Sequence, residues 1–161
     1  MLPLGRRDRT LIQQLHHTDS STPAQEAGTP GRLEELVTRR AAGLPLEQIV
    51  GWAEFCGLRI TVAPGVFVPR PETELLAGWA IDHLLTLERP VVVDLCCGSG
   101  AIGVAVAAAL GRVELHAVDV DPVAVRCARR NVEPVGGTVY DGDLDSPLPS
   151  SLRGRVDLVV A

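Results

Sequence analysis

The spacing of apolar residues changes near the middle of the chain. Residues 58–62 and residues 66–68 alternate apolar with polar side chains, and Pro64-Gly65 lies between the two runs. This alternation on both sides of a Pro-Gly pair predicts an antiparallel β-hairpin that turns at the pair. Over residues 71–87 the apolar positions recur instead at helical spacing, and the leading proline is tolerated in a first helical turn.

Beyond this helix, short apolar runs alternate with helical segments. We expect helices over residues 101–110 and 122–131, and strands over residues 91–95, 113–118, 138–140 and 156–161. Strands that alternate with ten-residue helices are typical of a parallel sheet covered by helices. The fold class is therefore α/β, with a Rossmann-like sheet of which this chain contains four strands.

The region before the hairpin is short and helical. Apolar stripes predict helices over residues 4–18 and 32–42, and the Ser-, Thr-, Pro- and Gly-rich residues 18–31 predict a linker. We divide the chain into a helical N-terminal region, a hairpin connector and a main α/β domain, with bounds 1–56, 57–71 and 72–161.

The composition excludes several functions. The chain has 161 residues, of which 46% are hydrophobic and 22% charged, so it can bury a core. All fifteen basic residues are arginine, and the lack of lysine excludes a P-loop and Schiff-base chemistry. A net charge of −5 and an aromatic content of 3% count against direct binding of nucleic acid.

The four cysteines follow neither a metal-site nor a disulfide pattern. Cys56, Cys96, Cys97 and Cys127 form no CxxC pair and have no histidine at ligand spacing, so we expect no metal site. They are typical of reduced cytosolic thiols, and we expect Cys96 and Cys97 to be small buried residues. The longest apolar run, residues 101–110, is too short for a bilayer, and the N-terminus lacks an apolar leader. We predict a cytoplasmic protein without a membrane partner.

The strongest chemical signal is a glycine-rich loop between a strand and a helix. Residues 94–100 read D-L-C-C-G-S-G, directly after an all-valine strand and directly before an alanine-rich helix. Glycines allow a ligand close to the backbone, and the helix N-terminus offers free N–H groups. A tight turn without any ligand is the alternative.

Carboxylates follow the next two strands. Asp119 ends one strand, where a carboxylate accepts two hydrogen bonds from a ribose diol. Asp121 precedes a proline at a helix start, so we assign it to capping. The third strand ends in Asp-Gly-Asp at residues 141–143. Because the carboxyl ends of parallel strands meet at one edge of a sheet, these groups predict a site for a nucleoside-bearing cofactor.

Two cofactors fit this pattern. Gly98, Gly100 and Gly103, with Asp119 about twenty residues on, match the NAD fingerprint. However, that fingerprint needs no acid before its glycines, whereas Asp94 stands there and further acids follow the third strand. A carboxylate before the loop can orient it and face the cation of S-adenosylmethionine. The pattern therefore favours S-adenosylmethionine, with NAD as the alternative.

Two stretches of the chain resemble a known family. One is G-W-A-E-F-C-G at residues 51–57 with V-P-R-P-E-T-E at residues 68–74. The other is D-L-C-C-G-S-G-A-I-G at residues 94–103 with A-V-D-V-D-P at residues 117–122. Together they resemble the hairpin, the P-R-P-E-T-E signature, the cofactor loop and the ribose acid of HemK-type protein-glutamine N-methyltransferases. The resemblance covers about residues 32–161, and the P-R-P-E-T-E hexapeptide makes it specific.

The resemblance implies a class I methyltransferase sheet, here its first four strands, with residues 72–161 as the N-terminal half of the S-adenosylmethionine-binding domain. The loop would wrap the methionine part of the cofactor, Asp119 would bind the ribose, and Leu144 would lie near the adenine. The implied cofactor-binding residues are Asp94, Cys96, Cys97, Gly98, Ser99, Gly100, Asp119, Val120, Asp143 and Leu144. Arg70, Glu72 and Thr73 would shape the wall between cofactor and substrate.

The implied reaction is methylation of the Gly-Gly-Gln glutamine of peptide-chain release factors, which would be the protein partner. The chain departs from the family at Cys96, where the first glycine usually stands, in its short helical N-terminal region, and in its catalytic motif. The family's Asn-Pro-Pro-Tyr follows the fourth strand, but the only asparagine here is Asn131 and the only tyrosine is Tyr140. We therefore assign no catalytic residue, expect the motif after Ala161, and predict that this chain alone is inactive.

Two further functions stay open beside NAD binding. One is a noncatalytic fragment that holds the cofactor without turning it over. The other is methylation of an exocyclic amino group in nucleic acid, because related enzymes share the Asn-Pro-Pro-Tyr device. Whatever the function, Val156, Leu158 and Val160 predict a hydrophobic edge strand over residues 156–161, through which chains can associate.

Overall fold

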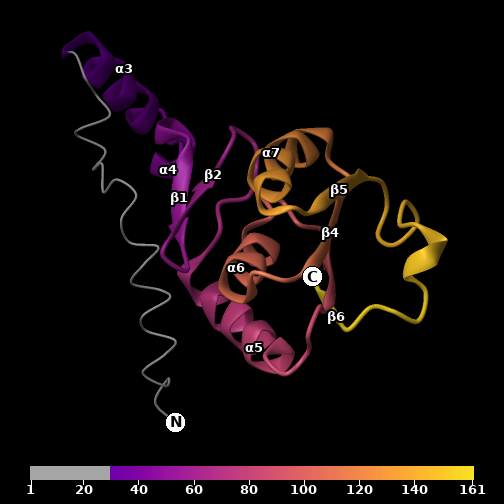
Figure 1. Ribbon diagram of the computed structural model, residues 1–161. Helices are drawn as coiled ribbons and strands as arrows, with labels where there is room; N and C mark the ends of the chain where they lie inside the picture. The colour runs from indigo at the N-terminus through magenta and orange to yellow at the C-terminus, as the bar shows by residue number, and fades with distance from the viewer. Residues whose placement is uncertain (1–29) are drawn as a thin grey trace, which may run out of the picture.

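The computed structural model describes residues 30–161, which fold around a four-stranded parallel sheet (Figure 1). The strands lie in the order β5-β4-β3-β6 and each neighbouring pair is parallel. Their bounds are β3 (Val91–Leu95), β4 (Glu114–Asp119), β5 (Thr138–Asp141) and β6 (Leu158–Val160). This confirms the predicted α/β class and all four strands, although β6 is shorter than expected.

Three helices cover one face of this sheet. They are α5 (Glu74–Leu84), which follows the 3-10 turn η1 (Pro71–Thr73), α6 (Ala101–Leu110) and α7 (Pro122–Val132), which runs into η2 (Glu133–Val135). Figure 1 shows α6 and α7 side by side against the sheet, with α5 next to α6. All three begin within three residues of the positions expected from the apolar spacing. No helix of the described part of the chain is long and apolar enough to cross a membrane.

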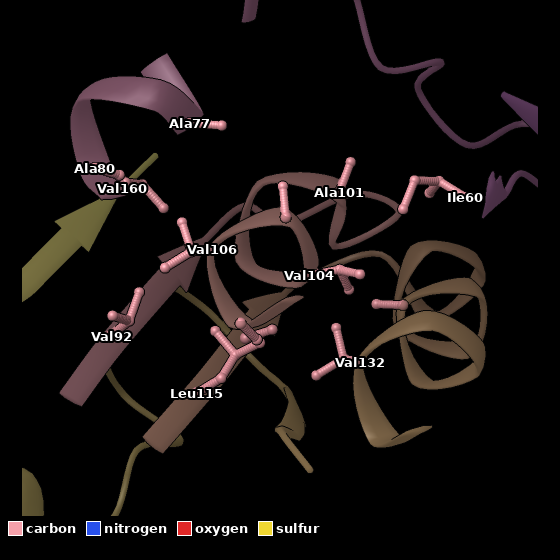
Figure 2. Packing of buried hydrophobic residues seen from close by; sticks show 14 of the residues in the cluster. Ile60, Ala77, Ala80, Val92, Ala101, Val104, Val106, Leu115, Val132 and Val160 are labelled. Carbon is pink, nitrogen blue, oxygen red and sulfur yellow. The ribbon is translucent and has the colours of Figure 1, made fainter. Parts of the chain in front are cut away.

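The main core fills the space between these helices and the sheet. Val92 of β3 and Leu115 of β4 point toward Val104 and Val106 of α6, and all four are at most 6% exposed (Figure 2). The alanine-rich sequence of α6 lets the helix approach the sheet closely. At Gly103 a Cβ atom would lie only 2.9 Å from the Leu115 side chain and 3.0 Å from the Asp94 carboxylate, so any larger residue would displace these groups.

The segment between β5 and β6, residues 142–157, lies on the side of the sheet opposite to the helices (Figure 1). Leu152, in the 3-10 turn η3 (Ser150–Leu152), is 4% exposed. The backbone N–H of Asp157 donates to the Val91 carbonyl at 2.9 Å, and the Val91 N–H donates to the Asp157 carboxylate at 2.8 Å. This reciprocal pair fixes the register in which β6 joins β3.

The N-terminal part of the described chain contains two helices and a hairpin. Its elements are α3 (Pro30–Ala41), α4 (Leu46–Val50), β1 (Trp52–Phe55) and β2 (Leu58–Thr61). Helix α3 confirms the helix expected over residues 32–42. The helix expected over residues 4–18, and most of the linker over residues 18–31, lie outside the described residues.

The predicted location of the hairpin is wrong. β1 pairs with β2 in antiparallel register, Phe55 opposite Leu58, so the chain turns at Cys56-Gly57 and not at Pro64-Gly65. Cys56 and Gly57 have φ angles of 51° and 72°, the left-handed backbone of a tight two-residue hairpin loop. Cysteine rarely marks such a turn, and this is why the sequence pattern failed.

Residues 66–68 alternate in burial without being a strand. Val66 and Val68 are buried and Phe67 is 68% exposed, which reproduces the alternating pattern that suggested a strand. The two valines pack instead against Ala53, Val62 and Cys127 in a second, smaller core. The alternation of apolar and exposed residues therefore predicted burial correctly. However, no strand in the described part of the chain pairs with this segment.

The edge strand β6 also differs in detail from the prediction. Leu158 and Val160 pack toward the helices, and Val160 is only 4% exposed. The exposed residue is Val159, at 54%, on the opposite face of the sheet. Within residues 30–161, β6 pairs with β3 alone, so one of its backbone edges has no strand beside it.

Candidate functional site

The glycine-rich loop between β3 and α6 curls over the carboxyl end of β4. The Cys97 N–H donates to the Val118 carbonyl at 3.0 Å, and the Gly100 N–H donates to the Cys97 carbonyl at 2.7 Å. Cys96, Gly98 and Gly100 all have φ angles between 51° and 77°. The loop therefore needs left-handed backbone at three of five positions, two of which are glycine.

Asp119 holds this loop from the end of β4. One carboxylate oxygen accepts the Gly98 N–H at 2.8 Å, and the other accepts the Asp121 N–H at 2.9 Å. A carboxylate has about four lone-pair sites, so two remain for a further donor pair such as a diol. The expected capping role of Asp121 is confirmed, because its side chain accepts the Val123 N–H at 2.8 Å.

Asp94 lies beneath the loop and does not face solvent. It is 2% exposed, and its carboxylate accepts the Gly103 N–H of α6 at 3.0 Å. Burial raises the pKa of the Asp94 carboxyl to about 7, the Gly103 N–H opposes this, and the nearby Asp119 adds to it. The carboxyl therefore fixes the start of α6 relative to β3, which orients the loop between them.

The turn after β5 brings a second group of predicted residues to the same edge. Asp141 lies beside Asp119 in the sheet register, and the Gly142 N–H donates to the Asp119 carbonyl at 3.1 Å. Asp143 is exposed beyond this turn. Leu144 is 52% exposed with φ 48°, and Val120, after β4, is 66% exposed. The ends of two adjacent strands thus offer apolar surface next to carboxylates.

The predicted wall residues lie where the chain enters α5. The Arg70 guanidinium stacks over the exposed Phe67 ring, 5.7 Å from its centroid. Glu72 and Thr73 belong to η1, and Glu72 is exposed. Their role between cofactor and substrate stays a prediction.

The expectation of two buried cysteines in the loop is wrong for Cys96, which is exposed. Its left-handed backbone turns the side chain outward, in a conformation that glycine adopts without strain. Cys97 is half-buried, and burial next to Asp94 and Asp119 raises the pKa of its thiol far above the ordinary value. Burial also raises the pKa of the Cys56 thiol to about 11. All four thiols are free.

Asn131 belongs to none of the sequence motifs, yet it contacts the loop. Its side chain is buried in α7 and donates to the Ser99 carbonyl at 2.8 Å. The signal for it is weak but physical. An amide at an apolar position of an amphipathic helix, beside Cys127, Ala128 and Val132, is a buried polar group that requires partners.

The hollow that stands out on the described surface lies elsewhere. It is open, has a volume of about 550 Å³, and is lined by residues such as Glu88, Arg89, Gly111 and Arg112. These residues precede β3 and β4, so the hollow is at the amino ends of the strands. The glycine loop and the acids lie at the carboxyl ends, where open α/β sheets bind ligands, and we place the site there.

Comparison with known proteins identifies the family. The sequence matches the methyltransferase small domain family over residues 57–161. The chain belongs to this family. The match confirms the Rossmann-like methyltransferase fold and S-adenosylmethionine as its cofactor.

Curated relatives confirm the resemblance to HemK-type enzymes. The release factor glutamine methyltransferase of Streptomyces coelicolor is 45% identical, over 84% of this chain and 49% of the relative. That of Bordetella pertussis is 38% identical, over 98% of this chain and 56% of the relative. A 4-amino-L-phenylalanine/4-methylamino-L-phenylalanine methyltransferase of Streptomyces pristinaespiralis is 42% identical, over 81% of this chain and 46% of the relative. The chain spans about half the length of these relatives.

Solved structures give a weaker likeness. The METTL16 methyltransferase domain is 20% identical with a TM-score of 0.46, over 63% of this chain and 43% of that one. The plantazolicin methyltransferase BpumL, solved in complex with SAH, is 14% identical with a TM-score of 0.43, over 95% of this chain and 45% of that one.

The residues present fit the family's cofactor. At Gly98 a Cβ atom would have open space around it, so a ligand can approach the backbone there. Asp119 keeps lone pairs for a diol, and Val120 and Leu144 offer exposed apolar surface for a planar base. Adenosine has all three complementary features, a diol, a base and a 5′ substituent that the loop can contact.

We predict that Asp94→Asn removes a pH dependence of folding stability. The pKa of Asp94 rises from 3.8 to about 7 on folding, so the unfolded chain binds fewer protons in this range. The free energy of unfolding of the natural sequence therefore falls as pH rises from about 4 to about 7, and levels off above. Asparagine still accepts the Gly103 N–H but does not ionise.

The measurement is urea unfolding at pH 4.5, 6 and 7.5, with the exposed Asp145→Asn as the matched control. The stability of Asp94→Asn relative to the natural sequence should increase with pH, by on the order of a few kcal/mol in total. The free energy of unfolding of Asp145→Asn should change with pH in parallel with that of the natural sequence. Parallel curves for Asp94→Asn as well would show that this carboxyl does not titrate in the window.

Proposed function

We propose that the protein takes part in S-adenosylmethionine-dependent methylation of the Gly-Gly-Gln glutamine of peptide-chain release factors. The observation that carries the proposal is the convergence of the glycine loop and Asp119 at one sheet edge, in a chain of the methyltransferase small domain family. Curated relatives from several genera, including Streptomyces, Corynebacterium and Bordetella, have the name release factor glutamine methyltransferase. These names favour a release factor as partner.

Each site residue has a stated role in this proposal. Residues 96–100 contact the methionine part of the cofactor through their backbone, and Asp119 accepts the ribose hydroxyls. Val120 and Leu144 enclose the adenine, and Asp143 receives its amino group. Asp94 orients the loop from below. When bound, S-adenosylmethionine supplies a methyl group activated by the positive charge on sulfur.

Residues 1–161 supply only the cofactor half of such a site. They contain no Asn-Pro-Pro-Tyr sequence, the motif whose asparagine and aromatic ring hold the target amide in related enzymes. A chain that binds the cofactor but lacks this motif would have the alternative function, which is cofactor binding without turnover. The assignment of Arg70, Glu72 and Thr73 to the wall follows from the family resemblance alone. The cytoplasm as location follows from the pattern of the four cysteines, which is typical of reduced thiols.

Three classes of molecule can be compared as the methyl acceptor: an aromatic amine, a nucleic acid and a release factor. The Streptomyces pristinaespiralis relative is named for an aromatic amine and has nearly the same identity as the release factor enzymes. Nucleic acid is disfavoured as acceptor because the chain is acidic and poor in aromatic residues. A release factor fits better because the P-R-P-E-T-E sequence at residues 69–74 resembles the HemK-type signature.

We predict that Asp119→Ala weakens binding of S-adenosylhomocysteine about ten- to a hundredfold. The substitution removes charge-assisted hydrogen bonds worth about 1.5–3 kcal/mol, and it frees the Gly98 N–H that Asp119 accepts. Isothermal titration of S-adenosylhomocysteine and NAD into both proteins measures this. Asp145→Ala, an exposed acid of the neighbouring segment, is the control with unchanged affinity. A preference for NAD, or an unaffected Asp119→Ala, contradicts the assignment.

We predict that the 161-residue chain transfers no methyl group to a release factor at a measurable rate. An amide nitrogen is a poor nucleophile, and positioning contributes about 7–11 kcal/mol to well-oriented reactions. The assay follows radiolabelled methyl transfer from S-adenosylmethionine to a Gly-Gly-Gln protein and to a Gly-Gly-Ala control. Transfer by this chain alone would show that catalytic residues lie within residues 1–161.

We predict that the isolated chain self-associates through β6. Val159 is exposed and one backbone edge of β6 has no neighbouring strand among the described residues. Size-exclusion chromatography with light scattering over a dilution series should show a mass that falls toward 17.1 kDa on dilution. Val159→Arg, which places charge on the exposed face without touching the core, should shift the equilibrium toward monomer. A concentration-independent monomer contradicts this prediction.

A further inference from the structure

We propose that Asn131 is a positioning residue that couples the β-hairpin to the cofactor loop, so that ligand binding in the loop fixes the hairpin. The inference rests on the proposed function for the identity of the ligand. It adds a residue that touches neither cofactor nor substrate in that proposal and that belongs to no recognised motif of the sequence.

The side-chain amide of Asn131 joins two segments that lie far from it in sequence. Its oxygen accepts the Thr61 N–H at 2.9 Å, and its nitrogen donates to the Thr61 carbonyl at 3.0 Å. The same nitrogen donates to the Ser99 carbonyl at 2.8 Å. Asn131 is 8% exposed, so the bond to Ser99 is buried and the two bonds to Thr61 are partly shielded from bulk water. Both amide hydrogens and the oxygen are therefore used, and neither backbone segment can shift without breaking a bond.

The packing around Asn131 makes this connection stiff. Its neighbour Val132 fills the space behind the loop, where a Cβ atom at Gly100 would lie 2.6 Å from a Val132 methyl group. On the other side, the Cys127 thiol donates to the same Thr61 carbonyl at 3.2 Å. One face of α7 thus contacts the loop and the hairpin at once, and within residues 30–161 Asn131 is the residue of this helix whose side chain hydrogen-bonds to both.

The hairpin leads directly to the residues proposed as the wall of the site. Its turn is bonded to the start of α5, because the Cys56 N–H donates to the Glu74 carboxylate at 2.9 Å. Arg70, Glu72 and Thr73 lie between these two anchored points. A loop fixed by its ligand therefore restrains Thr61 through Asn131, and with it the segment that carries the wall.

If Asn131 had only a structural role, it would stabilise the hairpin, but ligand binding in the loop would not change the mobility of Thr61. Two variants separate these roles. Asn131→Ala removes the bonds to both segments, whereas Cys127→Ala removes a bond to Thr61 and leaves the bond to Ser99 intact. Arg129→Ala, an exposed position of the same helix, is the control for changes in α7 itself.

The experiment measures amide hydrogen exchange at Thr61 and Gly100 by NMR, with and without S-adenosylhomocysteine. In the free chain, Asn131→Ala should speed exchange at both amides, Cys127→Ala at Thr61 only, and Arg129→Ala at neither. Saturating S-adenosylhomocysteine should slow exchange at Thr61 at least about fivefold in the natural sequence, as expected for coupled sites. The ligand should have no such effect at Thr61 in Asn131→Ala.

Two results overturn the inference. One is faster exchange at Thr61 in Asn131→Ala without any change at Gly100. The other is an unchanged Thr61 amide in the natural sequence when S-adenosylhomocysteine is bound, a result that needs no folded variant. If calorimetry shows no binding of S-adenosylhomocysteine, the proposed function fails, and the free-chain comparison of the variants alone decides whether Asn131 couples the two segments.

Discussion

A loop made of glycine, serine and cysteine cannot hold one shape by its own side chains, so other elements must fix it from outside. Three side chains do so, and each comes from a different part of the fold. Asp94 binds the start of the following helix from β3, Asp119 binds Gly98 from β4, and Asn131 binds Ser99 from α7. At Gly98 the loop carries no side chain, and the space where a Cβ atom would lie is open to a ligand. A preorganised backbone of this kind lowers the cost of ordering on binding.

This support determines what the surrounding elements can be. Helix α6 must lie close enough to β3 for the N–H of its third residue, Gly103, to reach a buried carboxylate. At this distance a Cβ atom on that residue would crowd the side chains of Asp94 and Leu115. Helix α7 must begin at the end of β4 and finish beside the loop, which places Asp121 at its start and Asn131 at its last turn. Two carboxylates consequently lie close together under one loop, and their mutual repulsion adds to the cost of ionising Asp94.

The sheet and its helices could be predicted from the sequence because the spacing of apolar residues shows which side of each strand or helix is buried. The sequence also located the loop and Asp119, because strand ends in a parallel sheet meet at one edge. It failed at the hairpin, since Cys56-Gly57 is not a recognised turn pair, and buried alternation at residues 66–68 suggested a strand without a partner. It also gave no role to Asn131, because a single amide has no periodicity and its partners are backbone groups 32 and 70 residues away. The roles of the ligand-contacting residues stay predictions, since they depend on a molecule whose shape the chain does not encode.

The reciprocal bonds between Val91 and Asp157 have a consequence for the order of folding. They close a loop of 66 residues, whereas β3 pairs with β4 across only 23, from Val91 to Glu114. Loop-closure entropy makes the longer connection about 1 kcal/mol more costly, so the pairs β3–β4 and β4–β5 are favoured to form first. During synthesis β6 leaves the ribosome after β3, β4 and β5. Until β6 pairs with it, β3 has one open side, and the nascent chain exposes the backbone edge of a strand with three consecutive valines, where another strand can bind.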